Sequence, residues 1–73
     1  MSAAALSALR LESVLLWLPP GAAALRPQVR QALQEHAGTA GWVGAEPLRW
    51  AITAVDPGRG LRLEAVLVVP AQQ

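Results

Sequence analysis

Residues 48–69 read LRWAITAVDPGRGLRLEAVLVV, and this stretch decides the fold. Apolar side chains alternate with other side chains over 48–55 and again over 61–69, which is the period of a β-strand with two different faces. The DPGRG segment at 56–60 is typical of a turn, because proline presets φ and glycine permits a positive φ. The stretch therefore predicts a β-hairpin with strands at about 48–55 and 61–69.

The apolar faces of the two strands predict how the hairpin is paired. We expect Asp56 to lie opposite Leu61, which sets Trp50 opposite Leu67. The apolar faces of both strands then coincide, so the register is self-consistent. Trp50 faces the core in this arrangement.

The second strand of the hairpin has a near twin at the start of the chain. Residues 9–15 read LRLESVL, and residues 61–67 read LRLEAVL. Residues 9–18 alternate as a strand does, and Pro19-Pro20 ends them because proline cannot donate to a ladder. We expect the odd-numbered residues of both twins to face the core. Nothing between the twins repeats, so they are two strands of one unit.

A helix is expected over 27–37. Proline suits its first position, where the missing N–H would have no partner, and Gly38 is a natural left-handed cap. The apolar stripe has helical spacing and comprises Val29, Ala32, Leu33 and His36. The glycine-rich connection at 38–47 holds Trp42, which we expect to plug one end of the core.

The element order is therefore strand, helix, strand, strand, in a single domain spanning 1–73. A right-handed crossover through the helix places the last strand in the middle of the sheet. We expect an α+β fold with a three-stranded antiparallel sheet of order 1-3-2 and one helix packed on one face. Residues 1–8 are expected to fray.

One helix covers one face of such a sheet, and the other face stays open. A chain of 73 residues without cysteine has a thin core and no disulfide, so association is the remaining way to stabilise it. We expect a homo-oligomer, a dimer or higher, with an unidentified protein partner as the alternative. The expected interface residues are Val14, Leu16, Leu18, Val55, Val66, Val68, Arg62 and Glu64.

The repeated Arg-Leu-Glu segment is self-complementary, which favours such an interface. Two copies of Arg62-Leu63-Glu64, paired antiparallel about the leucine, set arginine opposite glutamate twice, and Arg10-Leu11-Glu12 does the same at the edge strand. Two-fold interfaces favour self-complementary patterns of this kind. The alternative is that strands of one sheet draw on the same residue types.

Composition excludes several classes of function. Hydrophobic residues make up 53% of the chain and charged residues 15%, with no lysine and a net charge of +1. Nothing in this balance attracts nucleic acid or an acidic membrane. The apolar run after Glu12 is far shorter than the roughly 20 residues of a membrane span. We expect a cytoplasmic protein.

Few residues are candidates for catalysis or for binding a cofactor or metal. His36 is the only histidine and the only general-base candidate near neutral pH, and no serine is placed by a motif to act as its nucleophile. The glycines form no phosphate-binding pattern, and metal-ligand spacing is absent. We expect no cofactor and a non-catalytic interaction or assembly module, with an enzyme using His36 as a distant alternative.

A small-molecule binder is the nearer alternative. The element order, the length and Arg49-Trp50-Ala51 at the start of the second strand are similar to the dodecins, small flavin-storing proteins that assemble as hollow shells. The resemblance implies a flavin-type ligand stacked on Trp50, which requires the helix to cover the opposite face. The long 38–47 loop and the short 56–60 turn depart from the dodecin pattern.

Overall fold

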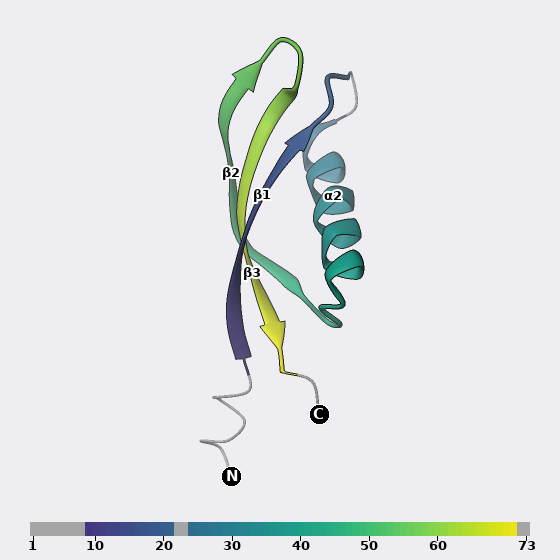
Figure 1. The fold of residues 1–73 in the computed structure, drawn as a ribbon, viewed down its shortest axis with the longest axis vertical. Coiled ribbons are helices and arrows are strands. Elements are labelled where there is room, and N and C mark those ends of the chain that lie inside the picture. Colours follow the sequence, from purple (N-terminus) through teal and green to yellow (C-terminus); the bar gives the residue numbers. More distant parts are fainter. Residues whose placement is uncertain (1–8, 22–23, 72–73) are drawn as a thin grey trace.

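The computed structural model describes residues 9–21 and 24–71, so the expectation for residues 1–8 lies outside the described residues. In the described part, four elements follow one another: strand β1 (Leu9–Leu18), helix α2 (Leu25–Ala40), strand β2 (Glu46–Asp56) and strand β3 (Gly60–Pro70). The strands form one strongly twisted sheet with α2 running alongside it (Figure 1). The sheet order is β1-β3-β2 and both pairs are antiparallel, as predicted.

Helix α2 begins earlier than predicted. It starts at Leu25, so Pro27 is its third residue rather than its first. The structure tolerates this because the first turn of a helix has N–H groups without intrahelical partners, and proline lacks one of them. The first hydrogen bond of the helix runs from the N–H of Gln28 to the carbonyl oxygen of Ala24, at 3.3 Å.

The helix also ends later than predicted, because Gly38 lies inside it and Gly41 forms the cap. Gly41 has φ of 77°, a left-handed conformation that glycine adopts at little cost. Its N–H donates to the carbonyl oxygen of Gly38 at 3.2 Å, and the N–H of Trp42 donates to that of Ala37 at 2.9 Å. Trp42 is thereby turned back onto the core, against which it packs as predicted.

The core lies between α2 and one face of the sheet. The helix contributes three buried residues one turn apart, which belong to the predicted stripe or extend it. The odd-numbered residues of the central strand β3 face the helix, as predicted. The buried apolar residues are Val14, Leu18, Val29, Leu33, Ala37, Leu63, Ala65, Leu67 and Val69.

Strand β1 turns the opposite face to the helix from the one predicted. Leu18 is 1% exposed, whereas Leu11 is 63% exposed. The register pairs Leu11 with Val68, so odd-numbered residues of β1 share a face with even-numbered residues of β3. The expectation that both twins bury their odd-numbered residues was therefore wrong for β1. The same letters, Leu-Arg-Leu-Glu, point to opposite faces in the two strands.

The hairpin register was also predicted wrongly, by two residues. Trp50 lies opposite Ala65 rather than Leu67, and Asp56 lies opposite Gly60. One residue of this register error comes from a turn that is tighter than predicted. The other comes from the irregularity between Ile52 and Ala54 of β2. Because side chains alternate with a period of two, this shift leaves Trp50 on the predicted face, packed against the core. The register shifts between Pro47 and Arg49 and between Ile52 and Ala54.

Asp56 holds the hairpin turn together and gives it a pH dependence. Its carboxylate accepts hydrogen bonds from the N–H of Arg59 at 2.9 Å and of Gly58 at 2.7 Å. These two bonds, that of Arg59 first, lower the pKa of Asp56 in the folded chain. A carboxyl group whose pKa is lower when folded contributes stability above its unfolded pKa, and this contribution is lost as the pH falls through the folded value.

We expect Asp56→Asn to reduce this acid sensitivity, because asparagine still accepts both hydrogen bonds but does not titrate. The measurement is the free energy of unfolding from urea titrations between about pH 5 and pH 2. The stability of the parent chain should fall more steeply across this range than that of the variant. Parallel curves would show that Asp56 contributes nothing to the pH dependence.

Candidate functional site

The sheet face away from α2, called the open face below, carries the exposed leucines of β1. It is formed by odd-numbered residues of β1 and even-numbered residues of β3, with Arg49 and Ala51 of β2. The Thr53 side chain also lies on this face, where it bonds to Glu64 and Arg62. Leu9, Leu11 and Leu15 of β1 are each more than half exposed. Together with Val66 and Val68 of β3, which are half-buried, these leucines are called the apolar strip.

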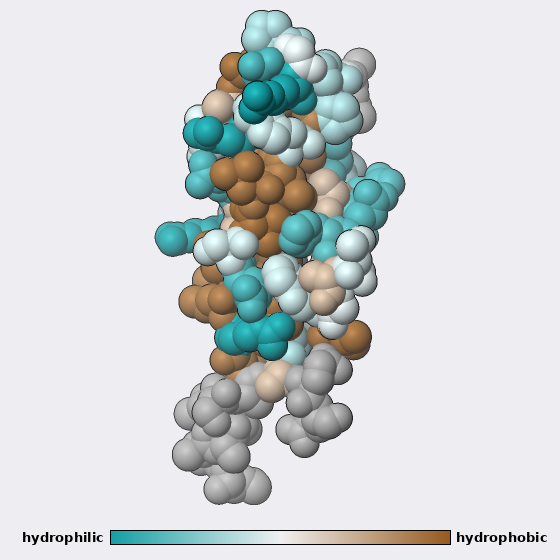
Figure 2. All heavy atoms as spheres, in the orientation of Figure 1, coloured by the Kyte–Doolittle hydropathy of each residue, from teal (hydrophilic) through white to brown (hydrophobic). Residues whose placement is uncertain are grey.

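Figure 2 shows apolar side chains gathered along the middle of the molecule, with hydrophilic ones around them. The largest side chains of the apolar strip lie on β1, an edge strand, because the sheet order is β1-β3-β2. Cross-strand pairs connect the strip, since Leu11 lies opposite Val68. Leu9 and Leu11 are therefore neighbours on β1, whereas Ser13, which lies opposite Val66, separates Leu11 from Leu15, which lies opposite Glu64.

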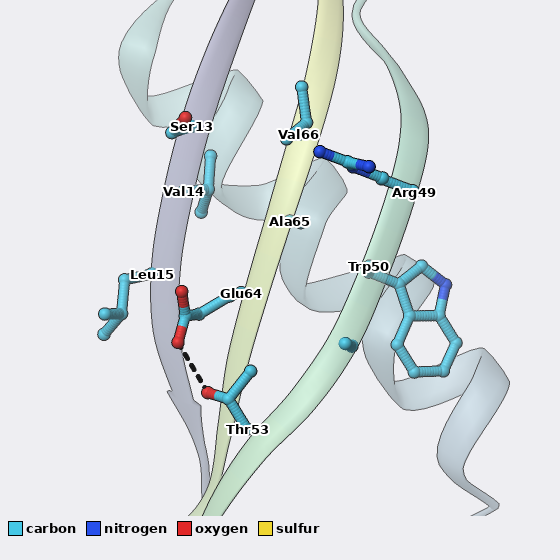
Figure 3. A pocket seen from close by; sticks show the side chains of 10 residues that line it. Ser13, Val14, Leu15, Arg49, Trp50, Thr53, Glu64, Ala65 and Val66 are labelled. Atoms are coloured by element: carbon cyan, nitrogen blue, oxygen red, sulfur yellow. Dashed lines mark hydrogen bonds between the residues drawn. The ribbon is translucent and has the colours of Figure 1, made fainter.

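The polar part of the open face lies beside β2 and is internally paired. The hydroxyl of Thr53 donates to a carboxylate oxygen of Glu64 at 2.7 Å, as Figure 3 shows. The Nε–H of Arg62 donates to the Thr53 hydroxyl oxygen at 2.9 Å, and Arg62 Nε lies 3.6 Å from the same Glu64 oxygen. Because these charges neutralise each other locally, covering this part of the face leaves no lone charge among these three residues.

Trp17 lies on the open face at the end of the sheet nearest the turn between β2 and β3. The guanidinium carbon of Arg59 lies 5.2 Å from the centroid of its ring, which is a cation–π distance. Trp17 also lies opposite Arg62 across the β1–β3 pair. The sequence carries no signal for the first contact, because Arg59 belongs to the turn and its direction depends on the hairpin's twist.

Between the two parts of the face lies a shallow hollow of about 590 Å³. It spans all three strands, and Figure 3 shows Glu64 and Thr53 on one side of it and Arg49 reaching toward Val66. Among the described residues, no histidine or cysteine lines the hollow. The hydroxyl–carboxylate pair that lines the hollow, Thr53 and Glu64, belongs to the hydrogen-bonded network described above.

The predicted interface residues divide into two groups. Val66, Val68, Arg62 and Glu64 lie on the open face. Val14 and Leu18 are buried in the core and Leu16 packs against it, so these three were misplaced on the open face.

Val55 is 75% exposed, but it lies opposite Leu61, which packs against the core. It lines a groove with Pro19 and Leu25 on the helix side of the sheet, so it too was misplaced. Sequence reasoning missed Leu9, Leu11 and Leu15, which it assigned to the core. No local signal could have found them, because residues 14–18 are apolar on both faces and only the register with β3 decides which face is buried.

Neither aromatic candidate for chemistry lies on the open face. The Trp50 indole projects beyond the outer edge of β2, away from Glu64 and Leu15 (Figure 3). Its ring packs against the core on the helix side, while Trp50 also contributes to the lining of the hollow. The ring of His36 meets Trp42 edge to face, with 5.5 Å between centroids. His36 is thus part of the packing around the end of the helix.

Two kinds of site are not found in the described part of the chain. Over residues 9–21 and 24–71, no three His, Cys, Asp or Glu side chains come together as metal ligands would. The helix described there is neither long nor apolar enough to cross a bilayer.

The chain matches the model of a protein family. Residues 10–69 match the family described as Domain of unknown function (DUF8621). No curated protein and no solved structure matches the chain. The matched residues run from β1 to the end of β3, so the family corresponds to the βαββ unit as a whole.

Proposed function

We propose that this chain, which belongs to the DUF8621 family, is a non-catalytic assembly module that binds further copies of itself through the apolar strip of its open face. The observation that carries this proposal is the exposure of Leu9, Leu11 and Leu15 on the same face of one strand, next to Val66 and Val68 of β3. Scattered exposed leucines are common on monomers, but contiguous apolar surface usually marks an interaction site.

The polar part of the open face supports a second copy as the partner. Arg62, Thr53 and Glu64 satisfy one another within the chain. A partner therefore needs no complementary charge over these three residues, and the apolar strip needs a matching apolar surface. An identical strip supplies such a surface, and two-fold association presents the same patch from both sides.

The size of the chain supports the same conclusion. Over the described residues its core consists of nine buried apolar residues, and a domain of this length buries only about 60% of its unfolded surface. Burying a leucine side chain contributes about 1.5–3 kcal/mol. Leu9, Leu11 and Leu15 are 53%, 63% and 55% exposed, so packing them fully against a partner recovers roughly half of that value for each leucine.

The test is the mass of the chain in solution, with and without the strip. We expect sedimentation or light scattering at micromolar concentration to give at least twice the chain mass of 7.7 kDa. The double variant Leu11→Lys with Leu15→Lys should weaken association by about 100-fold or more, because it puts two charges where apolar surface is buried.

Val43 and Val55 provide the matched control, because both are large, exposed apolar residues away from the apolar strip. Val43→Lys with Val55→Lys adds the same charge and should leave the mass unchanged. A parent chain with the mass of one copy would overturn the proposal. Equal effects of the two double variants would do the same, since the strip would then have no special role.

A further inference from the structure

We propose that two copies join edge to edge, with β1 of one copy paired antiparallel to β1 of the other, so that two three-stranded sheets become one continuous sheet. This inference rests on the proposed self-association and specifies its geometry. The β1 leucines of the two apolar strips then pack laterally against each other at the centre of the combined sheet.

The two edges of the sheet differ in how they are protected. Natural sheets protect exposed edges with prolines, bulges or charges that discourage another strand from pairing. The β2 edge has two such devices, because its register shifts twice and Pro47 lacks an N–H. β1 pairs with β3 in unbroken register from Leu9 to Leu18 and contains no proline. β1 is therefore the edge that accepts a further strand.

The charges on β1 do not protect it either. Arg10 and Glu12 are its only charged residues, and Arg10 Nε lies 2.6 Å from a carboxylate oxygen of Glu12. They lie on the helix side of the sheet, because they pair with Val69 and Leu67. On the open face of this edge the side chains of β1 are uncharged, so an incoming copy meets no repulsion from them.

The sequence of β1 complements itself when the two-fold axis passes through Ser13. Antiparallel pairing about this residue sets Leu11 of one copy opposite Leu15 of the other, and Leu9 opposite Trp17. All these residues belong to the open face, and opposite residues in antiparallel strands share a face. Every large side chain that β1 presents on this face thus meets an apolar partner.

Pairing about Leu11 is the competing register. It sets Arg10 of one copy opposite Glu12 of the other, but it overlaps only residues 9–13 of the described strand. Its charges gain little, because Arg10 and Glu12 already bond within one chain. Pairing about Ser13 overlaps residues 9–17 and matches the leucines, so it is the register we assign.

The chain contains no cysteine, so a single introduced thiol reports which residues meet. Ser13→Cys places a thiol opposite its own copy, within the reach of a disulfide. We expect mild oxidation to convert most of this variant into a covalent dimer that reductant reverses. Thr53→Cys is the control, because Thr53 is also exposed on the open face but lies on β2. It should stay uncrosslinked.

A second measurement does not depend on disulfide geometry. Amide hydrogen exchange should slow in β1, but not in β2, as the protein concentration rises, because only β1 gains hydrogen bonds from a second copy. A dimeric mass with crosslinking through Thr53→Cys and no change in β1 exchange would overturn the edge pairing and leave the proposed function standing. A mass of one chain would overturn both.

Discussion

Gly60→Ala is expected to cost about 4 kcal/mol or more of folding stability, which places it among the most damaging single substitutions. Gly60 has φ of 99°, where side chains are rarely accommodated. A Cβ atom there would lie 1.9 Å from the carbonyl oxygen of Leu18 and 2.9 Å from the nitrogen of Pro20. Both obstacles are backbone atoms, so the end of β1 must move away from β3.

Such a loss is large for this chain. A domain of this size has a total stability of roughly 4–11 kcal/mol. Since 1 kcal/mol shifts the unfolding midpoint of a small domain by about 4–8 °C, thermal unfolding followed by circular dichroism should show a drop of about 16 °C or more. The end of β1 and the start of β3 can thus lie this close together because residue 60 has no side chain.

Substitutions at two other glycines distinguish the cost of backbone strain from the cost of the steric clash. Gly41 has φ of 77°, but a Cβ atom added to it would meet nothing within 4 Å, so Gly41→Ala carries the backbone strain without the clash. We expect it to cost about 1–3 kcal/mol. Gly58 belongs to the same turn as Gly60, and the nearest neighbour of its added Cβ would be an Asp56 oxygen at 3.4 Å. Losses as large for these two as for Gly60 would refute the clash as the cause.

The clash also shows which parts of the fold could be predicted from the sequence. The alternation over 48–69 and the stripe around Val29 and Leu33 are local patterns, and they predicted the hairpin, the helix and its buried face. Gly60 was identified only as a turn residue. Its contact with Leu18 joins parts of the chain far apart in the sequence, and no local pattern encodes it.

The same limit explains the error in β1. From Val14 onward, residues 14–18 are apolar on both faces, so alternation could not decide which face is buried. The register with β3 decides it, by pairing Leu18 with Leu61 and Val14 with Ala65. The position on the open face was therefore predicted correctly for Val66 and Val68 and missed for the leucines of β1.

The two similar strands allow the difference between the faces buried by β1 and β3 to be tested. Leu11 and Leu63 occupy the same place in two copies of Arg-Leu-Glu, yet Leu63 is 0% exposed and Leu11 is 63% exposed. Leu63 lies on the central strand, opposite Leu16 on one side and Ile52 on the other. Leu63→Ala is expected to cost about 2–5 kcal/mol, because it removes buried methyl groups and leaves a cavity.

Leu11→Ala makes the identical chemical change on the open face. In the isolated chain it should alter stability by no more than about 0.5 kcal/mol. If Leu11 is covered by a second copy, the cost of its loss must grow with protein concentration, because association stabilises the folded state by mass action. The cost of Leu63→Ala should differ little between dilute and concentrated samples, since its contacts lie within one chain.

Urea titrations of both variants at a low and a high protein concentration test this directly. Equal losses at low concentration would mean that β1 buries its odd-numbered residues after all, and the open face would then lack its leucines. A small loss for Leu11→Ala at both concentrations would leave β1 correctly placed and remove Leu11 from the interface. A loss of stability for Leu11→Ala that appears only at high concentration would show that Leu11 contacts a second copy. Leu63, by contrast, would stabilise the fold of the single chain.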